Sequence, residues 1–206
     1  MSIVIIDYGM GNLGSIANMI KKIGGNSLIS SKVEDIENAD KLILPGVGSF
    51  DSGMKNITLS GLSDILNKKV LIDKIPILGI CLGMQLMTKG SEEGKEKGLG
   101  WIDAQTVKFN FSDIEQNPRI PHMGWNTVTK NKNHKIIEDI EFNSSRFYFV
   151  HSYFVKCQNE NDVLLTCNYF NNFTAAFQKD NIIGVQFHPE KSHKFGMKIF
   201  KNFLEL

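Results

Sequence analysis

The chain has 206 residues, of which 42% are hydrophobic and 22% are charged, a composition that supports the buried core of one soluble globular domain. Its formal net charge of +1 provides no basic surface of the kind that binds nucleic acid. No apolar run approaches the roughly 18 residues that a membrane-spanning helix requires, and the first residues lack the basic segment and cleavage site of a signal peptide.

The first half of the chain alternates apolar, strand-like runs with helical patterns. Strands are predicted at residues 3–6, 41–44 and 76–80, and helices at about 13–23 and 54–69. The strand-like runs are apolar throughout, which is typical of strands that are buried on both faces. Strands and helices in alternation therefore predict a parallel sheet with helices covering both of its faces.

The second half of the chain contains shorter β-type runs, at residues 106–111, 147–155, 163–169, 173–178 and 182–187, before a final helix at about 195–204. Their spacing predicts antiparallel or mixed strands beside the parallel core. No repeat, low-complexity segment or linker interrupts the chain. We therefore predict a single α/β domain over residues 1–206, with a central, mostly parallel sheet and added antiparallel strands in the C-terminal half.

The strongest local motif is GICLG at residues 79–83, which follows a predicted strand and precedes a helical segment. Small residues on both sides of Cys81 allow the sharp strand-to-helix turn called a nucleophile elbow, here with sulfur in place of a hydroxyl. The start of the following helix offers main-chain amides to an oxyanion. A buried structural cysteine in a tight turn is the alternative interpretation, so a base must be found before the motif indicates catalysis.

A candidate base, His188, lies in the segment GVQFHPE at residues 184–190, after the last predicted strand. Pro189 favours an extended main chain at this point, and the carboxylate of Glu190 can orient the imidazole. A His-x-Glu pair alone is usually a surface pair. Together with the elbow, it supplies the nucleophile, base and orienting group of a catalytic triad.

A formal dinucleotide-binding pattern, G-x-G-x-x-G, runs from Gly9 to Gly14. The acidic residue that should close the second strand about 20 residues later is missing, because residues 27–31 read SLISS. We therefore interpret Gly11 and its neighbours as a loop at the mouth of the site. The simplest interpretation of Asn12 is a helix N-cap.

The motifs GICLGMQ at residues 79–85 and QFHPE at 186–190 resemble those of the class I, or triad, glutamine amidotransferases. The resemblance implies a cysteine-dependent glutaminase in which Cys81 attacks the side-chain amide of glutamine, His188 transfers protons and Glu190 orients His188. It also implies that the ammonia leaves through a channel, and that neither a metal nor an organic cofactor is needed.

The same resemblance implies roles for residues around this triad. The PGVG turn is similar to the family's oxyanion strand, so the amides near Val47 or Gly48, with that of Leu82, would hold the tetrahedral oxygen. The residues implied to bind the amino-acid end of glutamine are Gln85, Ser152 and Tyr153.

Three further motifs, DYGMGN at residues 7–12, PHMGWN at 121–126 and YFVHSY at 148–153, resemble the glutaminase subunits of imidazole glycerol phosphate synthase, the HisH subunits. The matches extend over nearly the whole chain. The resemblance implies a heterodimer with a (β/α)8-barrel cyclase subunit, HisF, which uses the ammonia in histidine biosynthesis. The residues implied to face this partner are Asn12, Trp125, Tyr148 and Lys191.

Other interpretations stay open at this point. Gly14 stands where these subunits often carry a basic residue, and KSHKFG at residues 191–196 resembles paralogues that supply ammonia to surface-sugar amidotransferases. A stand-alone cysteine hydrolase, or a redox sensor with one reactive thiol, would keep the elbow and need no partner. A binding module with a vestigial triad is a third interpretation, although such a module usually loses one triad residue.

The remaining cysteines and histidines give weaker indications. Three cysteines without C-x-x-C spacing argue against a disulfide framework or zinc site, and favour a reducing, cytoplasmic setting. Cys157 and Cys167 lie in β-type runs and are expected in the core. His122 and His151 are interpreted either as structural hydrogen-bonding residues or as part of the site.

Overall fold

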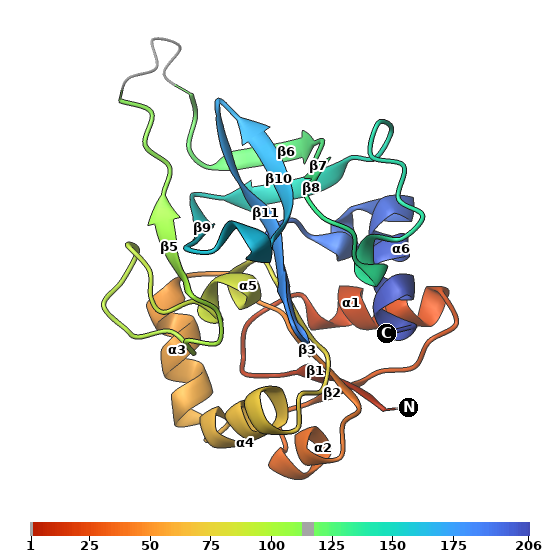
Figure 1. Ribbon diagram of the computed structural model, residues 1–206. Helices are drawn as coiled ribbons and strands as arrows, with labels where there is room; N and C mark the ends of the chain where they lie inside the picture. Colours follow the sequence, from red (N-terminus) through yellow and green to blue (C-terminus); the bar gives the residue numbers. More distant parts are fainter. Residues whose placement is uncertain (1, 113–117) are drawn as a thin grey trace.

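The computed structural model describes residues 2–112 and 118–206, and ten of the strands in those ranges form one sheet (Figure 1). Five of these strands pair in parallel, in the order β2 (Leu28–Ser30), β1 (Ile3–Ile6), β3 (Lys41–Leu44), β4 (Ile77–Ile80) and β12 (Ile182–Val185). No helix of the described ranges is both long enough and apolar enough to cross a membrane.

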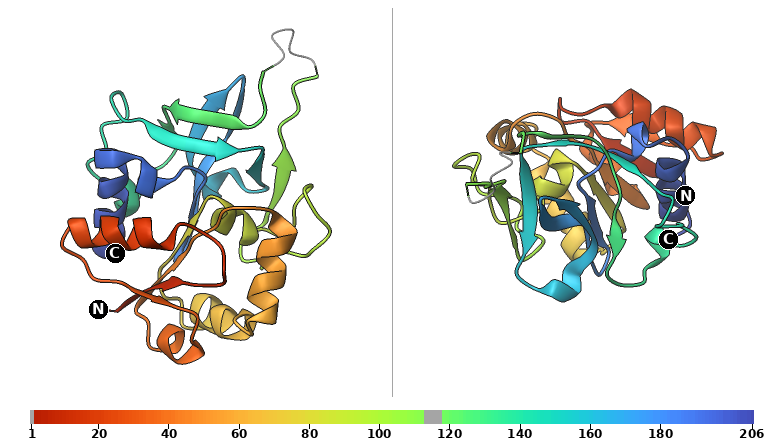
Figure 2. Two further views of the ribbon diagram at one scale, coloured as in Figure 1. Left: turned by 180° about the vertical axis from the view of Figure 1, so that it is seen from behind. Right: turned by 90° about the horizontal axis from the view of Figure 1, so that it is seen from above.

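The sheet continues beyond β12 with antiparallel strands. These are β11 (Asn171–Lys179), β10 (Val163–Tyr169) and β7 (Thr129–Lys130), with β9 (Tyr153–Cys157) paired to β11 and β5 (Ala104–Lys108) paired to β9. Two further strands, β6 (His122–Asn126) and β8 (Phe147–His151), form a small antiparallel sheet of their own. Figure 2 shows this pair lying across the antiparallel strands, on the side of the molecule that carries α1 (Leu13–Lys22).

Helices cover both faces of the parallel strands. One face is covered by α1 and α6 (His193–Leu204), and the other by α2 (Val33–Glu37), α3 (Phe50–Leu59), α4 (Ser63–Asn67) and α5 (Leu82–Leu86) (Figure 1). The short helical turns are η1 (Lys68–Ile72), η2 (Lys135–Ile137), η3 (Glu160–Asp162) and η4 (Pro189–Lys191).

The apolar strands explain why two cores form. Successive side chains of a strand point to opposite faces, so Ile3 and Ile5 of β1 pack under α1 and α6, while Val4 and Ile6 pack against the helices of the other face. All four side chains are buried. The predicted fold class, a mostly parallel sheet covered on both faces with antiparallel strands added in the second half, is confirmed.

The single helix predicted at residues 54–69 is wrong. The chain forms α3, which starts earlier at Phe50, and then α4 and the π-helical turn η1. Gly61, between α3 and α4, has a φ of +70°, a left-handed conformation that ends a helix and that glycine adopts at little cost.

The single strand predicted at residues 147–155 is also two strands. β8 ends at His151 and pairs with β6, whereas β9 starts at Tyr153 and pairs with β5 and β11. The chain therefore changes sheets at Ser152, and this residue is left between the two strands. The apolar pattern runs through the break because both strands bury one face, so the change of sheet could not be predicted from the pattern.

Candidate active site

The chain turns sharply at Cys81, between the end of β4 and the start of α5. Cys81 has a φ of +53°, which costs a non-glycine residue on the order of 1–3 kcal/mol and requires support from its surroundings. Part of that support is main-chain hydrogen bonding, because the Cys81 N–H donates to the Val185 carbonyl at 2.8 Å. The Cys81 carbonyl in turn accepts from the Gln85 N–H at 3.2 Å.

The elbow is sterically possible because its flanking residues are glycines. A Cβ added to Gly83 would lie 1.8 Å from the Leu44 carbonyl oxygen. One added to Gly79 would lie 2.9 Å from the Gly83 carbonyl oxygen, which belongs to the main chain of α5. Both distances are too short for any side chain, so the elbow packs directly against the end of β3 and against its own helix.

His188 lies beside the elbow because β12 is the neighbour of β4. The parallel register pairs Val185 with Ile80, so the chain leaves both strands at the same edge of the sheet. The side chain of His188 is buried, and its Nδ1 lies 2.8 Å from the Glu190 Oε1. This contact holds the imidazole with its other nitrogen available.

The other ring nitrogen, His188 Nε2, is buried, and within the described part of the chain no group makes a full hydrogen bond to it. The Cys81 thiol is nevertheless close enough to act on the ring. Burial alone would lower the pKa of His188, but the hydrogen bonds and charges of Cys81 and Glu190 outweigh burial and raise this pKa to about 10. An imidazole in this setting can accept the proton of the thiol.

A cavity of about 330 Å³ opens beside Cys81 and His188. Small-molecule sites typically occupy about 300–1,000 Å³, so the volume suits a ligand of amino-acid size. The other predicted site residues on its wall are Val47, Gly48, Leu82, Gln85, Ser152 and Tyr153. The structure thus brings all the residues predicted for the oxyanion and for glutamine to one cavity, and their individual roles stay predictions.

The PGVG turn lies directly against the elbow. A Cβ added to Gly46 would lie 2.8 Å from both the Gly83 nitrogen and the Leu82 Cβ. The Tyr8 hydroxyl donates a 2.6 Å hydrogen bond to the Pro45 carbonyl, and burial raises the pKa of this phenol, which stays protonated. The close approach places the main chain of the turn beside the first residues of α5, and the oxyanion role of both segments stays a prediction.

Two buried glutamines connect the cavity wall to the sulfur. Gln85 donates through its Nε2 to the Tyr153 carbonyl at 2.9 Å and to the Gln186 Oε1 at 3.0 Å. Gln186 Nε2 lies 3.7 Å from the Cys81 Sγ. Gln186 was not predicted as a site residue, although it is a polar residue directly after a buried strand and two positions before His188.

Glu93, in the loop between α5 and β5, also lines the cavity and was missed. Its Oε2 accepts a 2.8 Å hydrogen bond from the Phe50 N–H at the start of α3. The loop is held by Asp51, whose carboxylate accepts from the N–H groups of Lys95 and Glu96 at 3.0 Å each. Such tertiary contacts leave no local pattern, so the sequence carried no signal for Glu93.

Three of the four residues predicted to face a partner form one exposed cluster. Trp125 is 44% exposed and meets the Tyr148 ring edge-on at a centroid distance of 6.0 Å. Lys191 Nζ lies 5.7 Å from the centre of the Tyr148 ring, and His193 stacks on Trp125 at 5.5 Å. Asn12 is exposed before α1, which packs against η4, and its side chain makes no cap bond to the described helix.

The loop that begins at Gly9 packs against the PGVG turn, and its predicted place at the mouth of the site stays a prediction. A Cβ added to Gly11 would lie 3.0 Å from the Pro45 Cβ. The Met10 Cε approaches Gly48 so closely that a Cβ there would lie 2.6 Å away. These contacts place the loop against the PGVG turn.

The other two cysteines lack the surroundings of Cys81. Cys167 is buried and Cys157 is partly buried, and burial raises the pKa of each thiol to about 12. A thiol with so high a pKa carries almost no thiolate at neutral pH, so neither residue is an activated nucleophile.

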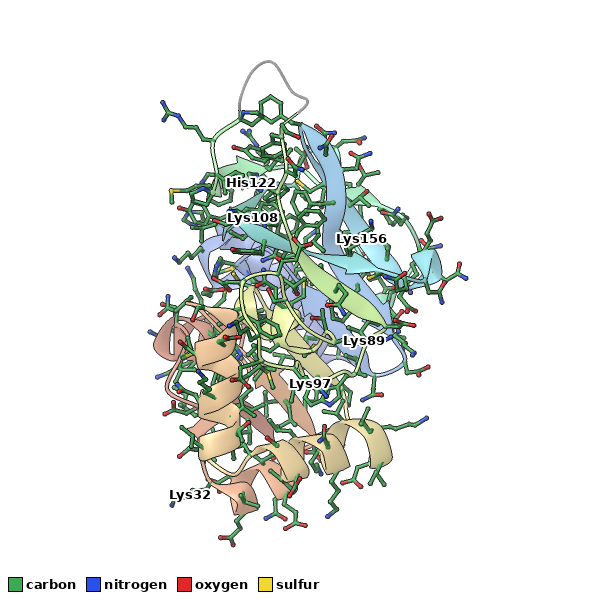
Figure 3. The ribbon with its side chains drawn as sticks, turned by 90° about the vertical axis from the view of Figure 1, so that its left-hand side faces the viewer. Lys32, Lys89, Lys97, Lys108, His122 and Lys156 are labelled. Atoms are coloured by element: carbon green, nitrogen blue, oxygen red, sulfur yellow. The ribbon has the colours of Figure 1, made fainter. Side chains whose placement is uncertain are left out.

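A larger hollow of about 1310 Å³ lies among the antiparallel strands. Its described wall includes Lys108 and Lys156, which Figure 3 labels on the strands β5 and β9, and contains none of the triad residues. The smaller cavity is the candidate active site because it holds both a nucleophile and a base.

Known proteins resemble this chain over nearly its whole length. The chain matches the family model described as glutamine amidotransferase class-I over residues 4–206. It is 59% identical to the imidazole glycerol phosphate synthase subunit HisH 2 of Methanococcus maripaludis, over 98% of each chain. It is 53% identical to the subunit HisH 2 of Pseudomonas aeruginosa, over 99% of each chain. It is 47% identical to the subunit HisH 1 of Campylobacter jejuni, over 99% of this chain and 100% of that protein.

Solved structures share the fold at much lower sequence identity. A crystal structure described as a glutamine amidotransferase superposes with a TM-score of 0.76 at 19% identity, over 98% of this chain and 97% of that one. The structure of PurLQS from Thermotoga maritima gives a TM-score of 0.74 at 16% identity, over 99% and 97% of the two chains. These likenesses support the architecture alone.

Proposed function

The chain belongs to the class I glutamine amidotransferase family, and on that premise we propose that it is the glutaminase subunit of imidazole glycerol phosphate synthase, the enzyme named in its curated relatives. It hydrolyses glutamine to glutamate and ammonia, and a cyclase subunit uses the ammonia in histidine biosynthesis. One observation carries the proposal: a single cavity is bordered by Cys81 and by the His188 that Glu190 orients.

The first half of the reaction forms a thioester. His188 Nε2 takes the proton of Cys81, and the sulfur attacks the carboxamide carbon of glutamine. The negative charge on the tetrahedral oxygen is held by main-chain amides around Gly48 and Leu82. His188 then returns its proton to the nitrogen as the C–N bond breaks, and ammonia leaves.

The second half releases glutamate. Water gives a proton to His188 Nε2 and attacks the thioester carbon, passing through the same oxyanion site. The C–S bond then breaks, and the proton returns to the Cys81 sulfur. Throughout both steps Glu190 stabilises the protonated imidazole through Nδ1 without itself becoming protonated.

The cavity wall also carries groups that suit the amino-acid end of the substrate. Glu93 supplies a carboxylate for the α-ammonium group, and the main chain at Ser152 and Tyr153 supplies polar groups for the remainder. The cavity wall therefore pairs a group of opposite charge with the part of glutamine that does not react.

Labelling with 6-diazo-5-oxo-norleucine, a reactive glutamine mimic, tests the site directly. We expect one equivalent of label on Cys81 and loss of glutaminase activity in parallel, because the mimic reacts with a nucleophile that has bound its amino-acid end. Peptide mass spectrometry locates the label. Excess glutamine should protect Cys81, and a label found on Cys157 or Cys167 instead would refute the assignment.

The exposed cluster of Trp125, Tyr148 and Lys191 is the proposed docking surface for the cyclase subunit, a (β/α)8 barrel. Aromatic and basic residues together are enriched at protein interfaces. Trp125 and Tyr148 lie opposite each other on the outer face of the β6–β8 pair, and Lys191 reaches the Tyr148 ring from η4. Met123, also on that face, is 62% exposed, so the surface continues along β6.

Replacing Trp125 by Ala should weaken binding of the cyclase subunit by about 30-fold, the effect of losing a contact worth about 2 kcal/mol. Isothermal titration with the cyclase subunit of the same organism measures the affinity. Leu59→Ala is the control, because Leu59 is 85% exposed at the end of α3 and lies outside the cluster. Equal affinities for both variants would remove Trp125 from the proposed interface.

A second candidate partner is favoured by the numerals in the relatives' names. HisH 2 and HisH 1 distinguish one such subunit from another, and a second subunit is free to serve a different synthase. The surface-sugar amidotransferases suggested by residues 191–196 are that alternative. Purifying the chain from its own cells and identifying the protein bound to it decides between a cyclase and a sugar amidotransferase.

A further inference from the structure

Two buried histidines lie beneath the outer surface of the β6–β8 pair. His122 and His151 stand directly opposite each other in the two strands. His122 Nδ1 lies 3.0 Å from His151 Nε2, and His151 Nδ1 lies 2.8 Å from the Tyr153 carbonyl oxygen. Both side chains are almost completely buried. Figure 3 shows His122 among the strands of the antiparallel half, away from the helices below.

These contacts belong to a hydrogen-bonded chain that runs from Asn126 through His122 and His151 to the Tyr153 carbonyl. The acceptors at its ends determine which ring nitrogen of each histidine carries the proton. A carbonyl oxygen can only accept, so His151 must carry its proton on Nδ1 and leave Nε2 as an acceptor. His122 must then donate from its own Nδ1, and its Nε2 accepts from the Asn126 Nδ2 at 3.3 Å. The same Asn126 nitrogen donates to the Asn168 carbonyl at 2.9 Å, which fixes the orientation of this amide.

The surroundings keep both imidazoles neutral, as this arrangement requires. His122 lies between the rings of Tyr169 and Phe149, at centroid distances of 4.1 and 4.9 Å. His151 meets the Phe173 ring at 5.1 Å. Burial lowers the pKa of His122 to about 4 and that of His151 to about 3, so neither is protonated at neutral pH.

The hydrogen-bonded chain ends at the main chain of Tyr153, which borders the active site. The Tyr153 carbonyl accepts from His151 on one side and from Gln85 on the other. Gln85 holds the Oε1 of Gln186, whose Nε2 faces the Cys81 sulfur. Donors and acceptors therefore alternate without conflict from Asn126 to the nucleophile.

We propose that His122 and His151 are positioning residues of the glutaminase site: their paired imidazoles hold the Tyr153 main chain, and through it Gln85, in the geometry that binds the amino-acid end of glutamine. This proposal rests on the function proposed above. His151 also lines the active-site cavity, but its two ring nitrogens are engaged by His122 and by the Tyr153 carbonyl, so the effect of the pair is on substrate binding rather than on the chemical step.

The hydrogen-bonded chain also connects the active site to the proposed docking surface. β6 carries His122 and Asn126 on its inner face and Met123 and Trp125 on its outer face, because successive side chains of a strand alternate. One strand therefore bears both the proposed docking surface and the start of the hydrogen-bonded chain. A partner that fixes β6 also fixes the support of Tyr153.

Substitutions at His122 test the proposal, because two amides mimic the two ring nitrogens. Asn places its nitrogen near the Nδ1 position and keeps the donor to His151, whereas Gln places its nitrogen near the Nε2 position and loses that donor. In the complex with the synthase partner, His122→Asn should keep the KM for glutamine within about threefold of the natural chain. His122→Gln should raise this KM by at least about tenfold, with kcat changed less.

Tyr169→Leu is the matched control for packing. It removes a ring that stacks on His122 but leaves the hydrogen-bonded chain intact. We expect it to lower the melting temperature without the rise in KM. If both His122 variants keep the natural KM, or if KM follows the melting temperature in all three variants, the histidines are only structural. A natural chain without any glutaminase activity would instead refute the proposed function.

A spectroscopic measurement tests the hydrogen-bonded chain independently of glutaminase activity. Long-range ¹H–¹⁵N correlation spectra of protein labelled in its histidines distinguish a ring that carries its proton on Nδ1 from one that carries it on Nε2. We expect both His122 and His151 to carry it on Nδ1 at neutral pH. A proton on Nε2 of either ring would break the order of donors and overturn the proposal.

Discussion

Replacing Cys81 by Ala is expected to reduce glutamine hydrolysis by about 10⁴-fold or more, because Cys81 is the only thiol among the described residues that line the cavity. Synthesis from added ammonium salt should continue at the rate of the natural complex, since ammonia then reaches the synthase partner without the glutaminase step. Assaying the complex with glutamine and with ammonium salt as alternative nitrogen donors measures both rates.

The control for this substitution is Cys157→Ala, which removes a partly buried thiol outside the cavity and should leave both rates unchanged. Survival of glutamine-dependent synthesis in Cys81→Ala would show that Cys81 is not the nucleophile. Loss of both rates would point to failed assembly, and co-purification of the two subunits separates that outcome from a chemical defect. A stand-alone hydrolase would show full turnover with no partner present.

The parts of the site that could be predicted are those that depend on patterns of neighbouring residues in the sequence. Gly79 and Gly83 around Cys81 signal a turn that no larger residue can make, and the structure shows the clashes that a Cβ would cause at both positions. The GVQFHPE segment begins within an apolar strand and continues past its end, so the placement of His188 just after a strand could also be predicted. The strand that lies beside β4 could not be predicted, because tertiary packing determines which parallel strands are neighbours.

The parts that could not be predicted depend on contacts between distant segments. Glu93 reaches the cavity because Asp51, more than forty positions earlier, holds its loop through Lys95 and Glu96. Gln186 acts on Cys81 across two adjacent strands, β12 and β4. Patterns of spacing report which face of an element is buried, but they do not report which side chains of two elements meet.

The two wrong secondary-structure predictions also lie where a periodic pattern continues through a break in the main chain. The helical pattern from residue 54 to 69 continues through Gly61, whose left-handed φ separates α3 from α4. The apolar run that ends at residue 155 hides the change of sheet at Ser152. That change has a functional result, because it leaves Ser152 on the cavity wall between β8 and β9.

Replacing Gly83 by Ala should destabilise the protein by about 3 kcal/mol or more and abolish glutaminase activity in the fraction that folds. The added Cβ would lie 1.8 Å from the Leu44 carbonyl oxygen and 2.8 Å from the Leu44 carbonyl carbon, so main chain rather than a flexible side chain must move. That movement separates α5 from β3 and displaces the Leu82 amide. Urea unfolding followed by circular dichroism measures the free energy of unfolding.

Gly14→Ala is the matched control, because a Cβ at Gly14 meets nothing within 4 Å and the residue lies in α1 with no left-handed φ. Alanine is the better helix former by up to about 1 kcal/mol, so this variant should be at least as stable as the natural chain and fully active. Loss of stability at position 83 with a gain at position 14 follows only if the elbow is packed as described. A Gly83→Ala variant with natural stability would mean that Leu44 and the elbow are not in contact, and the support for the strained main chain at Cys81 would then be absent.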